Sequence, residues 1–137
     1  MRAFIDTSTL IKRYLLEDGS IEFNDFLSDV STIVVSPVTI YEILAVFQRR
    51  FSEKDFLESD YKSKKEQFNK EYLHFDIMNW SEELHMKIIE TISIHTIKTL
   101  DAIQLSSGIL AKPDVFVSSD KMLLKCAKKE HFKLKTF

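Results

Sequence analysis

Residues 3–15 of the chain read AFIDTSTLIKRYL, which divides into an apolar run, a polar turn and a helical pattern. The apolar run is typical of a buried strand that ends at Asp6. After the turn, apolar residues recur at the spacing of one helix face, at Leu10, Ile11, Tyr14 and Leu15. The segment therefore predicts a strand, a turn and a helix, which is the first unit of a parallel α/β fold.

The remaining sequence repeats this alternation of short strands and longer helices. Apolar or β-branched runs predict strands at 32–36, 75–78 and 115–118, and a closing strand at 134–137. Helical spacing predicts helices at 21–27, 81–95, 99–111 and 121–129 and another after Pro37, and the charged segment 53–72 predicts a protruding helix or helical hairpin. We therefore expect a single α/β domain over residues 1–137, with a mostly parallel sheet of four to five strands flanked by helices.

Composition restricts the class of protein. The 137 residues include two Gly and two Pro, which argues against disordered chains and against barrels crowded with tight turns. A single cysteine cannot form an internal disulfide, and the apolar runs are far shorter than the roughly 20 residues of a membrane-spanning helix. We therefore expect a cytoplasmic protein with no membrane contact. The net charge of −2 gives no general attraction to nucleic acid, although residues 112–137 carry seven Lys against three acids.

Acidic residues accompany the predicted strands. Asp6 ends the first strand, and Glu42 lies about one helical turn after the second. Asp101 begins the helix before the fourth strand, and Asp120 follows that strand. Each acid alone has an ordinary explanation as a turn, capping or helix-face residue, but Glu42 is unusual because nearly all its neighbours are apolar and a partly buried carboxylate needs a partner. Because ligands of parallel sheets bind beyond the carboxyl ends of the strands, we expect the four acids to line one crevice.

Carboxylates that meet at one sheet edge repel one another and require a counter-charge. A hard cation such as Mg²⁺ or Mn²⁺ takes oxygen ligands and is typically held by a few carboxylates together with substrate phosphate. Such a site activates a bound water and stabilises a leaving oxygen, so phosphodiester hydrolysis is the chemistry that fits the four acids. Lys12, Arg13, Lys98 and Lys121 lie in the adjoining turns and are candidate phosphate contacts, with solvated helix positions as the alternative.

Four short motifs resemble those of the PIN-domain family, and more narrowly the ribonuclease toxins of VapBC-type toxin–antitoxin pairs. The motifs are Phe4-Ile5-Asp6-Thr7-Ser8, Tyr41-Glu42-Ile43, Leu100-Asp101-Ala102 and Phe116-Val117-Ser118-Ser119-Asp120. The resemblance implies a three-layer PIN-like domain in which the four acids hold Mg²⁺ or Mn²⁺ for RNA cleavage, supported by the hydroxyls of Ser8 and Ser118. It also implies a homodimer neutralised by a cognate antitoxin protein. Gln104 departs from the family pattern, which often has His at that position.

Two other functions remain open. One is a catalytically inactive binding or regulatory module with the same fold, acting through a protein partner. The other is a phosphoryl-transfer domain of the receiver or haloacid-dehalogenase type, although the turn after Asp6 lacks the second acid that both need. The four histidines and Cys126 fit no zinc pattern, so we expect isolated surface histidines and a packed cysteine. The sequence also has no Gly-rich phosphate loop and no serine-nucleophile elbow.

Overall fold

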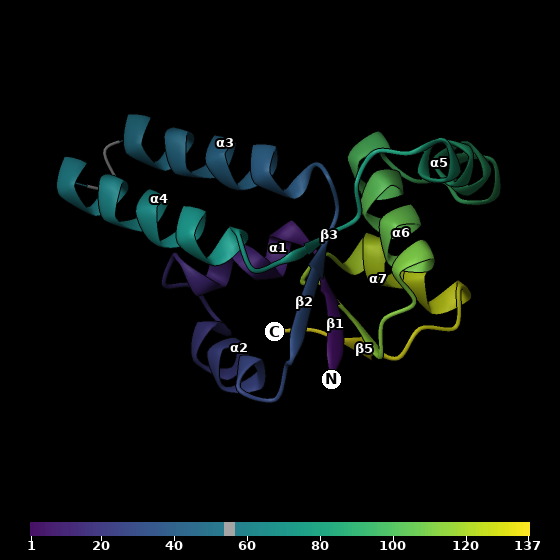
Figure 1. The fold of residues 1–137 in the computed structure, drawn as a ribbon, viewed down its shortest axis with the longest axis horizontal. Coiled ribbons are helices and arrows are strands. Elements are labelled where there is room, and N and C mark those ends of the chain that lie inside the picture. Colours follow the sequence, from purple (N-terminus) through teal and green to yellow (C-terminus); the bar gives the residue numbers. More distant parts are fainter. Residues whose placement is uncertain (54–56) are drawn as a thin grey trace.

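The centre of the fold is a five-stranded parallel sheet, seen in a computed structural model that describes residues 1–53 and 57–137 (Figure 1). The strands are β1 (Arg2–Ile5), β2 (Thr32–Val35), β3 (Asp76–Ile77), β4 (Val115–Val117) and β5 (Leu134–Lys135). Their order in the sheet is β3-β2-β1-β4-β5, and each neighbouring pair is parallel. The predicted α/β class and the predicted closing strand are confirmed.

The central strand β1 is buried on both faces of the sheet. Ala3 and Ile5 belong to one apolar cluster, whereas Phe4 belongs to a second cluster together with Leu105 and Phe116. Successive side chains of a strand point to opposite faces, so these clusters are the two cores above and below the sheet. A strand covered on both faces requires an apolar run without polar interruptions, which is what the sequence of β1 supplies.

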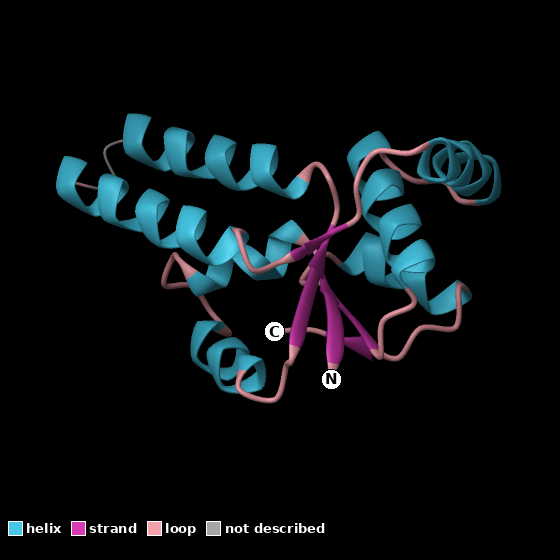
Figure 2. Ribbon diagram, in the orientation of Figure 1, coloured by secondary structure: helices cyan, strands magenta, loops and turns pink. Residues whose placement is uncertain are grey.

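Helices form a layer on each face of the sheet (Figure 2). They are α1 (Thr7–Leu10), the 3₁₀ turn η1 (Ile11–Arg13), α2 (Ser20–Leu27), α3 (Thr39–Ser52), α4 (Glu58–Tyr72), α5 (Glu82–Ile94), α6 (Thr99–Ala111) and α7 (Lys121–Lys129). The first predicted helix is divided into α1 and η1. Gly19 precedes α2 with a φ of +85°, a left-handed conformation that favours glycine. Within the described residues, no helix has both the length and the apolar character needed to cross a membrane.

The charged segment predicted at 53–72 contributes α4, which packs beside α3 as one arm of a helical hairpin (Figure 1). Residues 54–56 of that prediction lie outside the described residues. Phe68 anchors α4, because its fully buried ring contacts Tyr14 and Phe47 at centroid distances of 5.4 and 6.2 Å. One deeply buried aromatic side chain thus holds a helix whose other positions are mostly polar.

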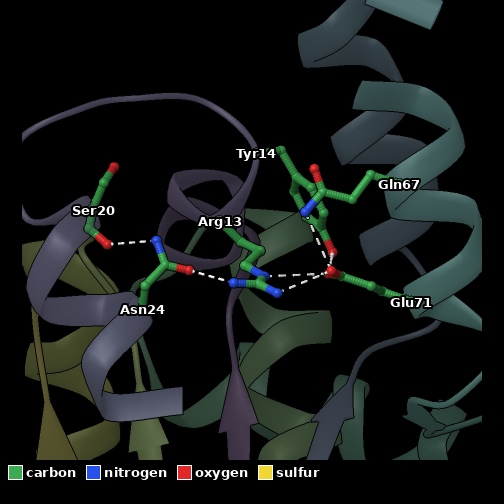
Figure 3. A network of polar contacts seen from close by, with 6 residues as sticks. All are labelled: Arg13, Tyr14, Ser20, Asn24, Gln67 and Glu71. Atoms are coloured by element: carbon green, nitrogen blue, oxygen red, sulfur yellow. Dashed lines mark hydrogen bonds and ion pairs between the residues drawn. The ribbon is translucent and has the colours of Figure 1, made fainter. Parts of the chain in front are cut away.

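A polar network fastens the end of α4 to η1 and α2 (Figure 3). Glu71 accepts hydrogen bonds from Arg13 Nη2 at 3.1 Å, Tyr14 Oη at 2.8 Å and Gln67 Nε2 at 3.2 Å. Arg13 Nη1 also donates to Asn24 Oδ1 at 2.7 Å. Burial by itself raises the pKa of Glu71, but these hydrogen bonds and the Arg13 charge outweigh it and lower the pKa below its ordinary value.

Candidate functional site

Asp6 lies directly after β1, at the carboxyl end of the central strand. Its backbone N–H donates to the carbonyl of Val117 at 2.9 Å, which holds the ends of β1 and β4 side by side. Its Oδ2 accepts hydrogen bonds from the hydroxyls of Ser8 and, at 2.9 Å, Ser118. Burial raises the pKa of Asp6, the two hydroxyls oppose that rise, and the charge of Glu42 adds to it. The structure therefore puts Ser8 and Ser118 where the family resemblance implies them.

Glu42 lies in the first turn of α3 and is held by residues of α1 and α6. Thr7 Oγ1 donates to Glu42 Oε1 at 2.9 Å, and Gln104 Nε2 donates to the same oxygen at 2.7 Å. Gln104 Nε2 also donates to Thr7 Oγ1 at 3.0 Å, so both amide hydrogens of Gln104 have acceptors. Glu42 therefore has the partner expected for a partly buried carboxylate, in the form of two neutral hydrogen-bond donors, Thr7 and Gln104. This role of Thr7 and Gln104 was not predicted from the sequence, where the position of Gln104 three residues after Asp101 was the available signal.

Asp101 and Asp120 face each other from two helix beginnings. Asp101 lies in the first turn of α6, and Asp120 caps α7 by accepting at Oδ1 from the backbone N–H groups of Met122 and Leu123 at 2.8 and 2.9 Å. Burial raises the pKa of Asp101, and the charges of Asp120 and Asp6 raise it further. Asp6 is in turn coupled to Glu42. The four acids thus form one electrostatically connected group at the carboxyl edge of the sheet.

The four acids, called here the acid group, offer oxygen donors alone, with the hydroxyls of Ser8 and Ser118 among them. This chemistry fits a hard divalent cation. In the part of the chain that the structure describes, however, no three His, Cys, Asp or Glu side chains are arranged to hold one metal ion. Asp6, Glu42 and Asp120 each use one oxygen for hydrogen bonds within the protein. The donor set therefore fits a cation in its chemistry, although the described residues form no ready three-carboxylate cage.

The basic residues expected to contact phosphate have different surroundings. Lys98 is near enough to Asp101 for its charge to oppose the rise in the pKa of that acid. Arg13 is engaged by Glu71 and Asn24, and the ammonium group of Lys12 donates to the carbonyl of Asp18. Among these three, Lys98 is the one whose charge acts on the acid group; the fourth candidate, Lys121, is exposed at the start of α7.

The expectation of isolated surface histidines is wrong for His95. This residue is 5% exposed, and its Nε2 lies 2.7 Å from Glu130 Oε1. The chain turns inward at the end of α5, which brings His95 against α7 where Glu130 is available as a partner. Cys126, expected to be packed, is buried at 7% exposure.

Two cavities lie in different parts of the fold. The larger, about 510 Å³, lies beside the Arg13–Glu71 network and none of the four acids lines it. The smaller, about 340 Å³, is lined by Thr96, Ile97, Lys98, Asp101, Asp120, Met122 and Cys126. The larger cavity and the acid group therefore lie in different places. We assign the candidate site to the acid group, because its negative charges require a partner.

Comparison with known proteins agrees with this arrangement. The family model of the PIN domain matches residues 3–129. Among solved structures, the chain is similar to VapBC2 from Rickettsia felis bound to a DNA fragment from its promoter, with 18% identity, a TM-score of 0.66, and coverage of 100% of this chain and 99% of that one. A toxin–antitoxin complex from Klebsiella pneumoniae has 19% identity, a TM-score of 0.65 and 88% coverage of both chains.

A third similar structure is FitAcB from Neisseria gonorrhoeae, with 11% identity, a TM-score of 0.68, and coverage of 96% of this chain and 95% of that one. At these identities the solved structures show a shared fold. No curated protein matches the sequence. The family model, however, spans nearly the whole chain, and the five-stranded parallel sheet agrees with it. The chain belongs to the PIN domain family.

Proposed function

We propose that this protein is a metal-dependent endoribonuclease that hydrolyses RNA phosphodiesters at Asp6, Glu42, Asp101 and Asp120. Mg²⁺ or Mn²⁺ is the cofactor that the chemistry of these donors favours. The observation that supports the proposal most is geometric: Asp6 and Asp120 follow neighbouring strands of a PIN-domain sheet, and two further acids, Glu42 and Asp101, lie in the first turns of helices.

The residues of the chain have distinct tasks in this proposal. Asp6 and Asp101 resist ionisation in the folded protein, so a cation that balances their charge is bound favourably. The hydroxyls of Ser8 and Ser118 orient Asp6, as Thr7 and Gln104 orient Glu42. A bound divalent cation supplies activation of water and stabilisation of charge on the phosphate.

The biological context belongs to the same proposal. VapBC2 and the Klebsiella structure are toxin–antitoxin assemblies with this fold. We therefore propose a VapC-like toxin that forms a homodimer in the cytoplasm and is neutralised by a cognate antitoxin. Co-expression with the neighbouring small reading frame tests this part, because a true antitoxin is expected to co-purify with the chain and suppress its nuclease activity.

An RNA cleavage assay tests the catalytic proposal. We expect the purified chain to cut single-stranded RNA in the presence of Mg²⁺ or Mn²⁺, and EDTA to stop the reaction. Asp101→Asn is expected to abolish cleavage, while Asp25→Asn, at an exposed position of α2, leaves it unchanged. Cleavage that persists in EDTA or in the Asp101→Asn variant would contradict the proposal.

In the described part of the chain no three carboxylates are arranged to hold one ion, and this favours a second candidate, a PIN-like module that binds a partner without catalysis. This candidate predicts a folded protein that associates with its partner but shows no metal-dependent turnover. The same assay separates the two functions.

A further inference from the structure

The smaller cavity adjoins the acid group. Asp101 and Asp120 form part of its wall, so the cavity shares two of the four acids. The rest of the wall comes from the connection between α5 and α6, at residues 96–98, and from Met122 and Cys126 of α7. Its volume of about 340 Å³ lies within the range of small-ligand sites. A substrate group held at the acids therefore has this cavity as its neighbour.

The charged residues of the cavity wall make it unfavourable for a second phosphate, besides the one at the acid group, to bind in the cavity. Two carboxylates and one ammonium group, that of Lys98, line the cavity. An additional anion inside it is repelled by Asp101 and Asp120, whereas an uncharged group is not. The part of an RNA chain that follows the phosphate into this cavity is thus expected to be neutral.

The remaining wall residues match a flat, mostly apolar group with a polar edge. Ile97, Met122 and Cys126 offer apolar contacts, and Thr96 and Lys98 offer hydrogen-bond donors. A ribose is neutral but lacks an apolar face. A nucleobase has two apolar faces and a polar edge, and bases are commonly bound by such mixed surfaces.

We propose that this cavity binds one unpaired nucleobase of the RNA, adjacent to the phosphodiester held at the acid group. The inference rests on the proposed nuclease function and adds to it a binding site for the base next to the cleaved phosphate. The faces of a base in a duplex are covered by its neighbours, so a base must be unstacked to enter the cavity.

Methyl NMR of methionine tests base binding without any cleavage. The chain has four Met, of which Met122 lines the cavity and Met86 is 57% exposed on α5. AMP, CMP, GMP and UMP are added separately to the full chain with Mg²⁺ present, because the acid group repels a phosphate that has no counter-ion. At least one nucleotide is expected to shift the Met122 methyl signal saturably and to leave Met86 unmoved.

Ribose 5-phosphate is the matched control, because it carries the sugar and the phosphate without a base. The inference is overturned if no nucleotide moves Met122, or if ribose 5-phosphate moves it equally. If the protein cleaves RNA but the Met122 methyl signal does not respond to nucleotides, the base site is disproved and the nuclease proposal is not affected. A Met122 signal that responds to nucleotides in a protein without nuclease activity supports the base site and removes the nuclease proposal.

A cavity-filling variant tests the same inference by kinetics. Ile97→Trp is expected to abolish the Met122 shift and to raise the KM for a short single-stranded RNA about tenfold, equivalent to ~1.4 kcal/mol, with kcat nearly unchanged. Ile94→Trp, at a 62% exposed position of α5, is the control. If Ile97→Trp does not fold, Met122→Ala replaces it and is expected to raise KM in the same way. An unchanged KM in the folded variant would count against the base site.

Discussion

Gln104 Nε2 lies 2.7 Å from Glu42 Oε1, so a neutral amide of α6 holds a carboxylate of α3. Gln104 is 1% exposed, and among the described residues its Oε1 has no hydrogen-bond partner. A hydrogen bond to a charged acceptor is stronger than one between neutral groups. Because the donor is neutral, Glu42 is oriented while its negative charge stays available to attract a cation.

Replacing Gln104 by Met is therefore expected to lower kcat for RNA cleavage by about tenfold or more, since a small misplacement of a reacting group has effects of this size. The amide donors disappear while the length of the side chain is kept. The matched control is Gln48→Met, at an exposed position of α3. An unaltered kcat in a folded Gln104→Met variant would show that Glu42 does not depend on the amide.

Asp101→Asn is expected to raise the Tm at pH 7 while it abolishes cleavage. The pKa of Asp101 is raised in the folded protein, first by burial and then by Asp120 and Asp6. Such an acid destabilises the fold as the pH rises through the folded pKa, because the native state resists the ionisation that the unfolded state permits. The gain is at most about 1 kcal/mol, because solvent screens a half-buried carboxyl.

Thermal denaturation between pH 3 and pH 8 measures this effect. The difference in Tm between Asp101→Asn and the parent is expected to shrink as the pH falls below the ordinary pKa of 3.8. Asp25→Asn serves again as the control. A variant less stable than the parent at pH 7 would mean that Asp101 has a stabilising partner.

Glu71→Gln is expected to destabilise the protein at pH 7 by about 1 kcal/mol, a typical value for a hydrogen bond to a partly exposed charged group. Because the folded pKa of Glu71 is lowered, its contribution is present above the ordinary value of 4.5 and is lost as the pH falls through the folded pKa. Urea titrations at pH 7 and pH 3 should therefore differ, with the variant and the parent converging at the lower pH. Glu66→Gln, exposed on the same helix, is expected to have no such effect.

Gly108→Ala is expected to destabilise the fold by about 1–3 kcal/mol, as overpacking of a core does. A Cβ at Gly108 would lie 2.6 Å from Phe116 Cε2, so either the buried Phe116 ring or α6 must move. Phe116→Leu in the same chain is expected to restore part of the lost stability. Ser107→Ala is the contrasting control, because it removes a buried hydroxyl that has no partner among the described residues and should leave stability unchanged or raised.

Much of the fold could be predicted from local patterns. The β1 strand is an uninterrupted apolar run, and short runs at 32–36 and 115–118 are its two neighbours in the sheet. These patterns succeed because burial on both faces of a parallel sheet demands apolar residues at each position. The division of the first helix into α1 and η1 was not predicted, because helical spacing alone does not show where a short helix tightens into a 3₁₀ turn.

The sequence by itself determined the class of fold and led to the prediction of the four acids, because strand patterns and residue types are local properties of the chain. The tertiary structure alone decided that Gln104, 62 positions from Glu42, donates to it, and that His95 is buried against Glu130. Such contacts depend on how helices distant in the chain pack on the sheet, and no local pattern records that packing.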